Sequence, residues 1–258
     1  MTLPAPDSAL RICVVVPARN EEEFVGSCLR ALAEQEGVSC EEYEILLVLD
    51  ECADGTEARA REVAASYPSL RLHLLDGPGE GSGHARRMGM EAACDRLCAL
   101  GRPHALISST DADTVVAPDW ASAQLAAAER GARAIGGRIE LADDGTVPKA
   151  LLEWHLARGD LRHKRLLSEP APSGRTEHWQ FSGASMALTA AVYRKVGGME
   201  PRHALEDEQL EHALRRHGVP IERLLSVRVA TSARLVGRAG QGLAYDLSTA
   251  AKTLRVDE

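Results

Sequence analysis

The feature of this sequence that most constrains its fold is a regular alternation of short apolar runs with amphipathic stretches in its first half. The first run, residues 11–17, is continuous and rich in valine, as expected for a strand buried on both faces of a parallel sheet. Similar strands are predicted at residues 43–49, 70–75 and 104–107, each followed by a polar loop. Strands that alternate with helices in this way predict a doubly wound α/β fold.

The helices between these strands are predicted from apolar spacing and from the residues at their ends. The first follows Asn20, which is expected to cap it, and carries Glu21–Glu23 in its first turn, where the helix dipole favours acidic side chains. This helix is expected to end near Gly37. Two further helices are predicted over residues 57–67 and 84–100, and they complete the alternation.

The second half of the chain is less regular, and neither an internal repeat nor a clear linker divides it from the first. One domain with an elaborated C-terminal half is therefore expected, and 258 residues are enough to bury a sizeable core. The predicted elements are a helix over 118–129, a strand over 132–140, a helix over 151–167, an extended segment over 180–188, helices over 190–196 and 204–217, and a strand over 221–230. A tail over 231–258 follows.

Polar motifs follow each of the four predicted parallel strands. They lie at residues 17–20, 50–56, 76–83 and 111–113. In a doubly wound sheet, ligands bind beyond the carboxyl ends of the strands, so these four motifs share one edge. Their common location favours a ligand site over four unrelated turns.

Asp111 and Asp113 are the carboxylates of the last motif. On an extended segment, residues two apart point to the same side, so both side chains would face one ligand. Carboxylate oxygens suit a divalent cation that also binds phosphate oxygens. The alternative is a polar turn that closes the strand, because aspartate is common in turns. The place of the pair at the shared edge favours the ligand site.

The glycine-rich loop over residues 76–83 leads into a predicted helix. Glycines let the backbone approach a phosphate, and the helix N-terminus supplies partial positive charge. The adjacent Arg86 and Arg87 are candidates for a pyrophosphate contact, and a solvated helix face is the alternative for either one. Dinucleotide-binding and methyltransferase folds place such a loop after the first strand, whereas here it follows the third.

Two further groups of carboxylates have both a structural and a functional interpretation. Asp50 either binds a base or ribose or only ends its strand. Glu206–Glu208 open a predicted helix, where acidic residues stabilise the helix dipole. One of them facing the site would instead accept a proton from a hydroxyl nucleophile. The sequence alone does not choose between these roles.

Charge and cysteine content exclude several classes of protein. A net charge of −8 argues against a general nucleic-acid binder. The six cysteines form no CxxC pair and are expected to be reduced thiols. No basic region precedes an apolar one at the N-terminus, and no apolar stretch approaches the ~18 residues of a membrane span. A cytoplasmic protein without integral membrane association is therefore expected.

The assembled motifs resemble those of the family-two glycosyltransferases of GT-A fold, in the order in which that family has them. The matching segments are 14–21, 50–56, the glycine-rich loop with Ala85–Arg86, 110–113, 181–185, 196–198 and 206–207. The resemblance runs from residue 11 to 230 and implies one GT-A domain over 1–258, with a Rossmann-like, doubly wound, mostly parallel sheet. Its parts would be a nucleotide-sugar-binding half over 11–115, an acceptor-side half over 116–230 and a C-terminal tail over 231–258.

The resemblance also implies roles for single residues. The residues that bind the nucleotide and donor would be Pro17, Ala18, Asn20, Asp50, Gly83, Arg86 and Asp111. Of these, Asp50 would contact the base and Asp111 would lie nearer the ribose. Asp113 would be the direct ligand of a Mg²⁺ or Mn²⁺ ion, which neutralises the leaving diphosphate as a Lewis acid.

On the acceptor side, the resemblance implies a wall formed by Gly183, Ala184 and Glu206. Asp207 matches the catalytic base, which deprotonates the acceptor hydroxyl for in-line attack and inversion at the anomeric carbon. Some relatives of this fold retain configuration, and Asp207 would then position the acceptor instead.

The chain departs from the family pattern in three ways. The double aspartate usual after the second strand is Leu49–Asp50 here, which leaves base specificity open. The later basic motif that often ends in Arg-Trp is absent, and Arg234 and Arg238 are expected to replace it as a phosphate clamp. No processive membrane machinery exists in the sequence, which argues against a polysaccharide synthase.

The leading hypothesis is a metal-dependent transferase that moves one sugar from a UDP- or GDP-linked donor to a small soluble acceptor. One alternative is a sugar-phosphate nucleotidyltransferase, whose glycine-rich basic loop after the first strand is missing from Pro17–Asn20. Another is a catalytically silent nucleotide-sugar-binding protein, against which the intact carboxylate pair argues. A homodimer is left open.

Overall fold

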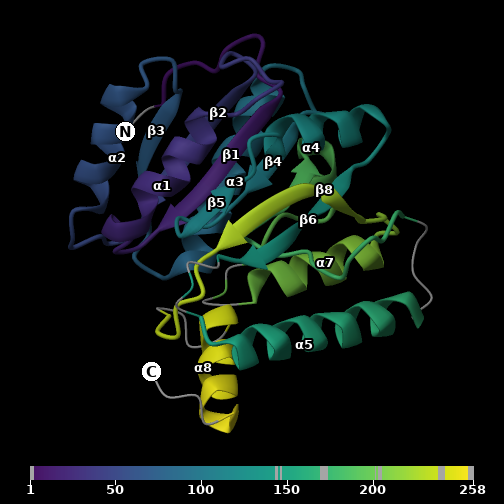
Figure 1. Ribbon diagram of the computed structural model, residues 1–258. Coiled ribbons are helices and arrows are strands. Elements are labelled where there is room, and N and C mark those ends of the chain that lie inside the picture. The colour runs from purple at the N-terminus through teal and green to yellow at the C-terminus, as the bar shows by residue number, and fades with distance from the viewer. Residues whose placement is uncertain are drawn as a thin grey trace.

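The structure, a computed structural model, describes residues 3–142, 145, 147–168, 174–200, 202, 205–237 and 242–254. The strands in this part of the chain are β1 (Ile12–Ala18), β2 (Tyr43–Leu49), β3 (Leu72–Asp76), β4 (Leu106–Ser109), β5 (Thr114–Val116), β6 (Ala134–Leu141), β7 (Met186–Thr189) and β8 (Glu222–Thr231). They form one sheet in the order β3-β2-β1-β4-β7-β6-β8-β5 (Figure 1).

The helices of the same residues lie on both faces of this sheet or below its lower edge (Figure 1). They are α1 (Glu22–Ala33), α2 (Thr56–Ser66), α3 (Ser82–Ala99), α4 (Trp120–Glu129), α5 (Lys149–Ser168), α6 (Ala190–Lys195), α7 (Glu206–Arg216) and α8 (Leu243–Leu254). Each predicted strand and helix has a counterpart among them. The three-residue strand β5 and the tail helix α8 are not among the predicted elements.

Parallel pairing of the first four strands confirms the doubly wound fold. Ile12 lies opposite Tyr43 of β2 on one side and opposite Leu106 of β4 on the other. The carboxyl ends of β1, β2 and β4 therefore meet at one edge. Beyond β4 the sheet is mixed, because β7 runs antiparallel to both β4 and β6 while β8 runs parallel to β6.

The apolar run of β1 is continuous because the strand has a hydrophobic core on each face. Val14 and Val16 belong to the core formed with α1, α2 and α4. Cys13 and Val15 belong to the opposite core, formed with α3, α6 and α7. All four side chains are fully buried, as expected for a strand in the middle of a doubly wound sheet.

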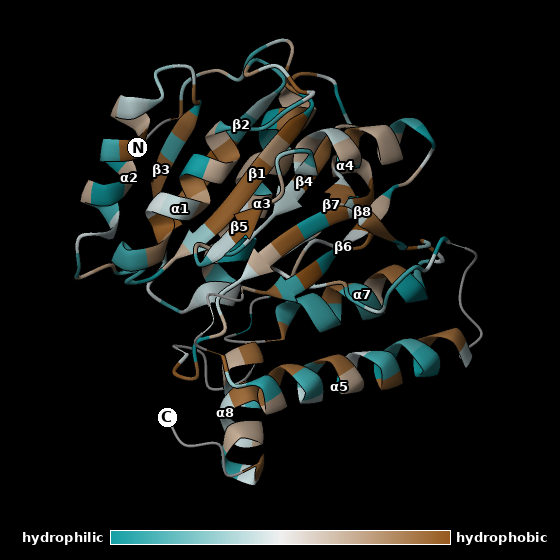
Figure 2. Cartoon of the chain, in the orientation of Figure 1, coloured by the Kyte–Doolittle hydropathy of each residue, from teal (hydrophilic) through white to brown (hydrophobic). Residues whose placement is uncertain are grey.

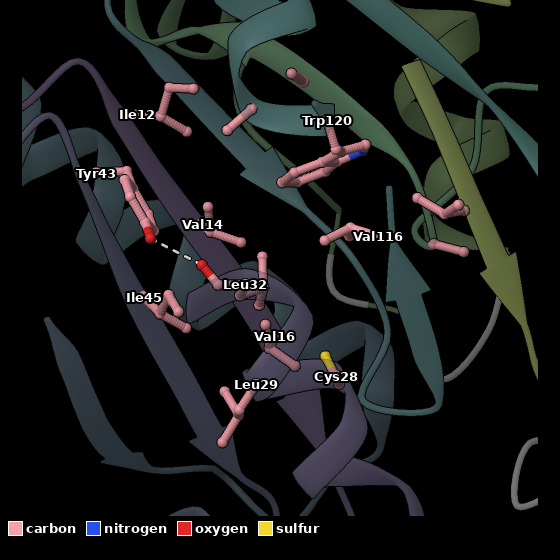
Figure 3. Packing of buried hydrophobic residues seen from close by; sticks show 14 of the residues in the cluster. Ile12, Val14, Val16, Cys28, Leu29, Leu32, Tyr43, Ile45, Val116 and Trp120 are labelled. Carbon is pink, nitrogen blue, oxygen red and sulfur yellow. Dashed lines mark hydrogen bonds between the residues drawn. The ribbon is translucent and has the colours of Figure 1, made fainter. Parts of the chain in front are cut away.

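The core under α1 also buries polar groups with their partners. In Figure 3, Leu29 and Leu32 of α1 lie over Val14 and Val16, and the Tyr43 hydroxyl donates a hydrogen bond of 2.8 Å to the Leu32 carbonyl. Buried tyrosines usually find such a partner. The carbonyl lies near the end of α1, so this bond fixes the helix against β2.

The helices α5 and α8 pack mainly on each other, away from the two large cores. Leu151, Leu247 and Ala250 form a separate buried cluster, and Arg158 pairs with Asp246 at 2.6 Å. Figure 2 shows β1 as largely hydrophobic, whereas α5 and α7 carry many hydrophilic residues. In the described part of the chain, no helix combines the length and apolar content needed to cross a membrane.

Candidate active site

Hydrogen bonds join the loops that follow β1 and β2 at the carboxyl edge of the sheet. Asn20 does not cap α1 as predicted, because Glu21 stands at that position. The Asn20 backbone is instead left-handed, with φ 54°, a conformation that asparagine tolerates better than most residues. Its side-chain oxygen accepts a hydrogen bond of 2.7 Å from the Ala53 amide. Pro17 and Ala18, the last residues of β1, are buried beneath this loop.

Asp50 fixes the glycine-rich loop. Its carboxylate is almost fully buried and accepts hydrogen bonds from the Gly79 amide at 2.6 Å and from the Gly81 amide at 2.9 Å. Arg19 lies 3.5 Å from the same carboxylate. Two of the loop amides that a phosphate would need are therefore directed at Asp50. This contact orders the loop beside the end of β2.

Arg86 lies at the centre of the site rather than on a solvated helix face. Its guanidinium donates to Asp111 Oδ1 at 2.6 Å, to Glu206 Oε1 at 2.9 Å and to Ser109 Oγ at 2.6 Å. A fourth bond of 3.1 Å reaches the Gly183 carbonyl. The side chain is 5% exposed. Arg86 thus links Asp111 to Glu206 at the start of α7, and these two carboxylates outweigh burial and raise its pKa.

Two glycines of the predicted site make room for this arrangement. A Cβ atom on Gly183 would lie 2.5 Å from the Arg86 guanidinium, so a side chain there would displace the arginine. A Cβ atom on Gly83 would lie 2.1 Å from the Arg202 carbonyl. A side chain approaches Gly183 and a backbone carbonyl approaches Gly83, and such close approach is a common reason for glycine outside turns.

Asp111 and Asp113 do not lie on an extended segment as expected, because residues 112 and 113 form a turn between β4 and β5. The turn directs the two carboxylates at different partners. Asp111 pairs with Arg86, whereas Asp113 Oδ2 lies 2.7 Å from Nη2 of Arg234. Arg234 also donates two hydrogen bonds of 2.8 Å to the carboxylate of Glu21.

Negative charge exceeds positive charge around Asp113. The carboxylates are Glu21, Asp111, Asp113 and Glu206, and the guanidinium groups are Arg86 and Arg234. Burial, together with the charges of Asp111 and Glu21, raises the pKa of Asp113 above its ordinary value, against the lowering effect of Arg234. Burial and the same carboxylates raise the pKa of Cys28 nearby, so this thiol stays protonated at neutral pH. The site favours additional positive charge.

Asp113 and its surroundings fit a divalent cation. The Arg234 guanidinium shows that the Asp113 oxygen is directed at a point where a cation is stabilised. Among the described residues, no three His, Cys, Asp or Glu side chains are grouped as a complete metal site. Magnesium in phosphate-transfer sites is usually held by one or two carboxylates, with substrate oxygens and water as the other ligands. A single protein ligand at Asp113 agrees with that pattern.

The first turn of α7 gives its three carboxylates different environments. Glu206 is buried and paired with Arg86, and Glu208 is exposed. Asp207 is half-buried, and its Oδ2 accepts a hydrogen bond of 3.1 Å from the Gly183 amide. Ala184, the next residue along, is buried. The predicted acceptor-side residues are therefore neighbours, although they come from segments far apart in the chain.

A hollow of about 100 Å³ lies between α5, β6 and residues 177–180. Its lining includes Arg138, His155 and Trp179. Arg162 stacks 4.5 Å above the Trp179 ring, and burial lowers its pKa. The hollow therefore has a cationic and aromatic side.

Two members of the site, Glu21 and Ser109, are not predicted from the sequence, and one predicted member lies outside the described residues. The sequence places Glu21 in a helical turn and Ser109 at the end of a strand, whereas both contact arginines of the site. The available signal for Glu21 is its position in the matching segment 14–21. Arg234, one of the two arginines predicted to clamp the phosphates, lies 2.7 Å from Asp113 at the site. Arg238, its expected companion, lies outside the described residues.

Comparison with known proteins places the chain among sugar-transferring enzymes. A family model described as "Glycosyltransferase like family 2" matches residues 9–238. Glycosyltransferase AglE of Haloferax volcanii is 32% identical over 89 residues, which are 34% of this chain and 29% of that protein. The match thus covers less than a third of the curated relative's length.

Solved structures with similar folds include a mannosyltransferase and S. aureus TarS. S. aureus TarS 1–349 aligns with a TM-score of 0.61 at 16% identity, over 95% of this chain and 71% of that one. The mannosyltransferase PcManGT from Pyrobaculum calidifontis, in complex with GDP-Man and Mn²⁺, aligns with a TM-score of 0.62 at 20% identity, over 98% and 67%. TarS 1–349 is also known in complex with UDP-GlcNAc. At these identities the likeness shows the fold, and it confirms the predicted GT-A architecture.

Proposed function

The chain belongs to glycosyltransferase-like family 2 and is a glycosyltransferase, and from this premise we propose the reaction that it catalyses. It transfers one hexosyl group from a nucleotide-diphosphate sugar to a hydroxyl of a small soluble acceptor, with a divalent cation and with inversion. The observation that carries this proposal is the buried, carboxylate-rich site around Asp113, with Asp207 held beside it by the Gly183 amide.

The donor is proposed to lie along the carboxyl ends of β1, β2 and β4. Pro17, Ala18 and Asn20 border it on one side. Asp50 acts there by ordering the glycine-rich loop through the Gly79 and Gly81 amides. Both UDP- and GDP-linked sugars are candidates, because similar folds hold UDP-GlcNAc in one case and GDP-Man in the other.

The proposed metal ligand is Asp113, and the ion is Mg²⁺ or Mn²⁺. When bound, such an ion neutralises charge on the leaving diphosphate as a Lewis acid. Asp111 is fixed beside it by Arg86 and is proposed to face the ribose. Arg86 is then a positioning residue for the donor site, because its remaining bonds go to protein groups.

Asp207 is the proposed general base. The bond from Gly183 orients its carboxylate, and two hydrogen bonds from amides leave about half of the carboxylate's four acceptor sites for a hydroxyl proton. A base so placed activates the acceptor for direct attack on the anomeric carbon, which inverts its configuration.

A donor panel tests this function. Purified protein is mixed with UDP- and GDP-linked sugars, and nucleotide release is measured with Mn²⁺, with Mg²⁺ and with a chelator. We expect metal-dependent release from a subset of donors, and stabilisation against heat by the same donors. If no nucleotide sugar shifts the melting temperature with or without metal, the proposal is wrong. The cytoplasmic location and the homodimer stay predictions.

A further inference from the structure

Arg234 contacts the proposed metal ligand Asp113 and a second carboxylate, Glu21. Its Nη2 atom lies 2.7 Å from Asp113 Oδ2 and 2.8 Å from Glu21 Oε1, and its Nη1 atom lies 2.8 Å from Glu21 Oε2. The guanidinium carbon is 5.2 Å from the centre of the Phe24 ring. The guanidinium is thus a cation bound to an oxygen of Asp113, the proposed metal ligand.

The backbone near Arg234 is attached to the site independently of this side chain. The Ser232 amide donates a hydrogen bond of 3.1 Å to the Asp113 carbonyl. Thr231 lies opposite Thr114 in the β5–β8 pair, and their hydroxyls are 2.9 Å apart. The Arg234 side chain is 23% exposed. Its guanidinium can therefore change partners by rotation about side-chain bonds while the end of β8 stays in place.

A metal ion and the guanidinium cannot both bind Asp113 Oδ2 closely. Divalent cations bind carboxylate oxygens at about 2.0–2.6 Å, and a guanidinium nitrogen 2.7 Å from the same oxygen would lie against the ion. Two positive groups at such a separation repel strongly in a partly buried site. A diphosphate brings new negative oxygens, and a guanidinium binds these well through its paired N–H groups.

We propose that Arg234 competes with the divalent cation for Asp113 and exchanges this carboxylate for the donor diphosphate when metal and donor bind together. The inference rests on the proposed function and adds to it how the binding of the metal ion depends on the binding of the donor. Metal alone binds weakly, because it must displace an ion-paired arginine. Metal and nucleotide each strengthen the binding of the other, since linkage between two ligands is reciprocal.

Calorimetric titrations of the full chain test this exchange. Mn²⁺ alone, UDP and GDP alone, and each nucleotide with Mn²⁺ are titrated into wild type, Arg234→Met and Arg228→Met. Arg228 is the matched control, because it is an arginine of β8 with a 55% exposed side chain, and its replacement changes net charge equally. We expect Arg234→Met to bind Mn²⁺ alone about tenfold more tightly and the nucleotide with Mn²⁺ about tenfold more weakly, a usual size for coupling between sites. Arg228→Met should match wild type.

The outcomes separate this inference from the proposed function. Mn²⁺ affinity in Arg234→Met equal to or below that of wild type overturns the competition. If nucleotide binds with Mn²⁺ but Arg234→Met binds Mn²⁺ alone no more tightly than wild type, the donor site is supported and only the exchange is refuted. Tighter Mn²⁺ binding in Arg234→Met without any nucleotide binding supports the competition and contradicts the donor site. No Mn²⁺ binding in any of the proteins overturns both.

A second variant covers the case in which Arg234→Met fails to fold. Arg234→Lys keeps the charge and loses the paired N–H groups that hold Glu21. Its affinity for Mn²⁺ alone should be higher than that of wild type. If Arg234→Met folds, the affinity of Arg234→Lys should be lower than that of Arg234→Met. An affinity no tighter than that of wild type, in protein with native circular dichroism, contradicts the competition.

Discussion

At the scale of single residues, the site is held together by a buried arginine. Arg86 uses four of its five N–H donors on Ser109, Asp111, Gly183 and Glu206. Loss of this guanidinium leaves two carboxylates without their counter-ion in a poorly solvated place. The adjacent Arg87 pairs instead with Glu91 on an exposed part of α3.

This contrast predicts different stabilities for two neighbouring variants. Arg86→Met should lower the free energy of unfolding by about 3 to 5 kcal/mol, the usual cost of removing one partner from a buried pair. Arg87→Met, its matched control, should lower it by less than about 0.5 kcal/mol. Urea titration followed by circular dichroism measures both. Equal losses would show that Arg86 is not a structural link.

Asp113 is expected to serve catalysis rather than folding. Asp113→Ala should lower metal-dependent nucleotide release by about 100-fold or more, because a Lewis acid supplies several kcal/mol of charge stabilisation. Its melting temperature should stay close to that of wild type, since the substitution also relieves repulsion from Asp111 and Glu21. Asp119→Ala, which removes a half-exposed carboxylate, is the control. Full activity in Asp113→Ala would refute the metal assignment.

Asp207 and Glu208 form a second matched pair for mutagenesis. Asp207→Asn keeps the shape of the side chain and removes the basic oxygen, so transfer should fall by about 10²- to 10⁴-fold, the usual contribution of a general base. Donor affinity should not change. Glu208→Gln, at an exposed position of the same helical turn, should keep normal rates. Product formation and donor binding are measured separately, and equal effects in the two variants count against the base.

At the scale of elements, α1 is fixed to the sheet by apolar packing as well as by its ends. Leu29 is fully buried between α1 and the central strands (Figure 3). Leu161 of α5, in contrast, is 68% exposed. Leu29→Ala should therefore lower the free energy of unfolding by about 2 to 5 kcal/mol through lost burial and a cavity. Leu161→Ala should cost less than about 0.5 kcal/mol. Denaturant titration compares them, and a small loss in Leu29→Ala would contradict this packing.

At the scale of the whole molecule, a buried ion pair ties strand β2 to helix α3 and makes stability depend on acid. Arg96 donates to Glu44 at 2.6 Å, and His73 lies 3.3 Å from the same carboxylate. Burial favours the protonated form of Glu44, but Arg96 and His73 outweigh it and lower its pKa to about 2. Because the folded pKa is depressed, the charged form stabilises the fold above the unfolded value and this contribution is lost as pH falls.

The expected loss of stability lies between about pH 5 and pH 2 and amounts to about 3 kcal/mol for this one group. Glu44→Gln should be less stable than wild type at pH 7, and the difference should shrink steadily toward pH 2. Unfolding free energies at a series of pH values, each from a urea titration, check this. A difference that stays constant over that range would show that Glu44 does not carry the acid dependence.

Much of the fold follows from local patterns. The runs at β1, β2 and β4 and the helical spacing of α1 and α3 predict the doubly wound half, because each pattern reports which faces are buried. The four strand-end motifs likewise predict the edge where the site lies. The strand β5 is not predicted because three residues give no periodicity. The helix α8 is not predicted either, although Leu243, Leu247 and Ala250 have helical spacing and form its apolar face.

The sequence by itself determined the fold class, the edge of the sheet that carries the site, and the residue types available there. Only the tertiary structure decided which residues pair. Arg86 faces Asp111 and Glu206 rather than solvent, and Arg234 reaches Glu21 across 213 positions of the chain. The physical reason is that backbone periodicity is a local property, whereas charge pairing depends on distances set by the closing of the whole sheet. Residues 110–113 were thus identified from sequence as a candidate cation site, and the partners that divide Asp111 from Asp113 came from the fold.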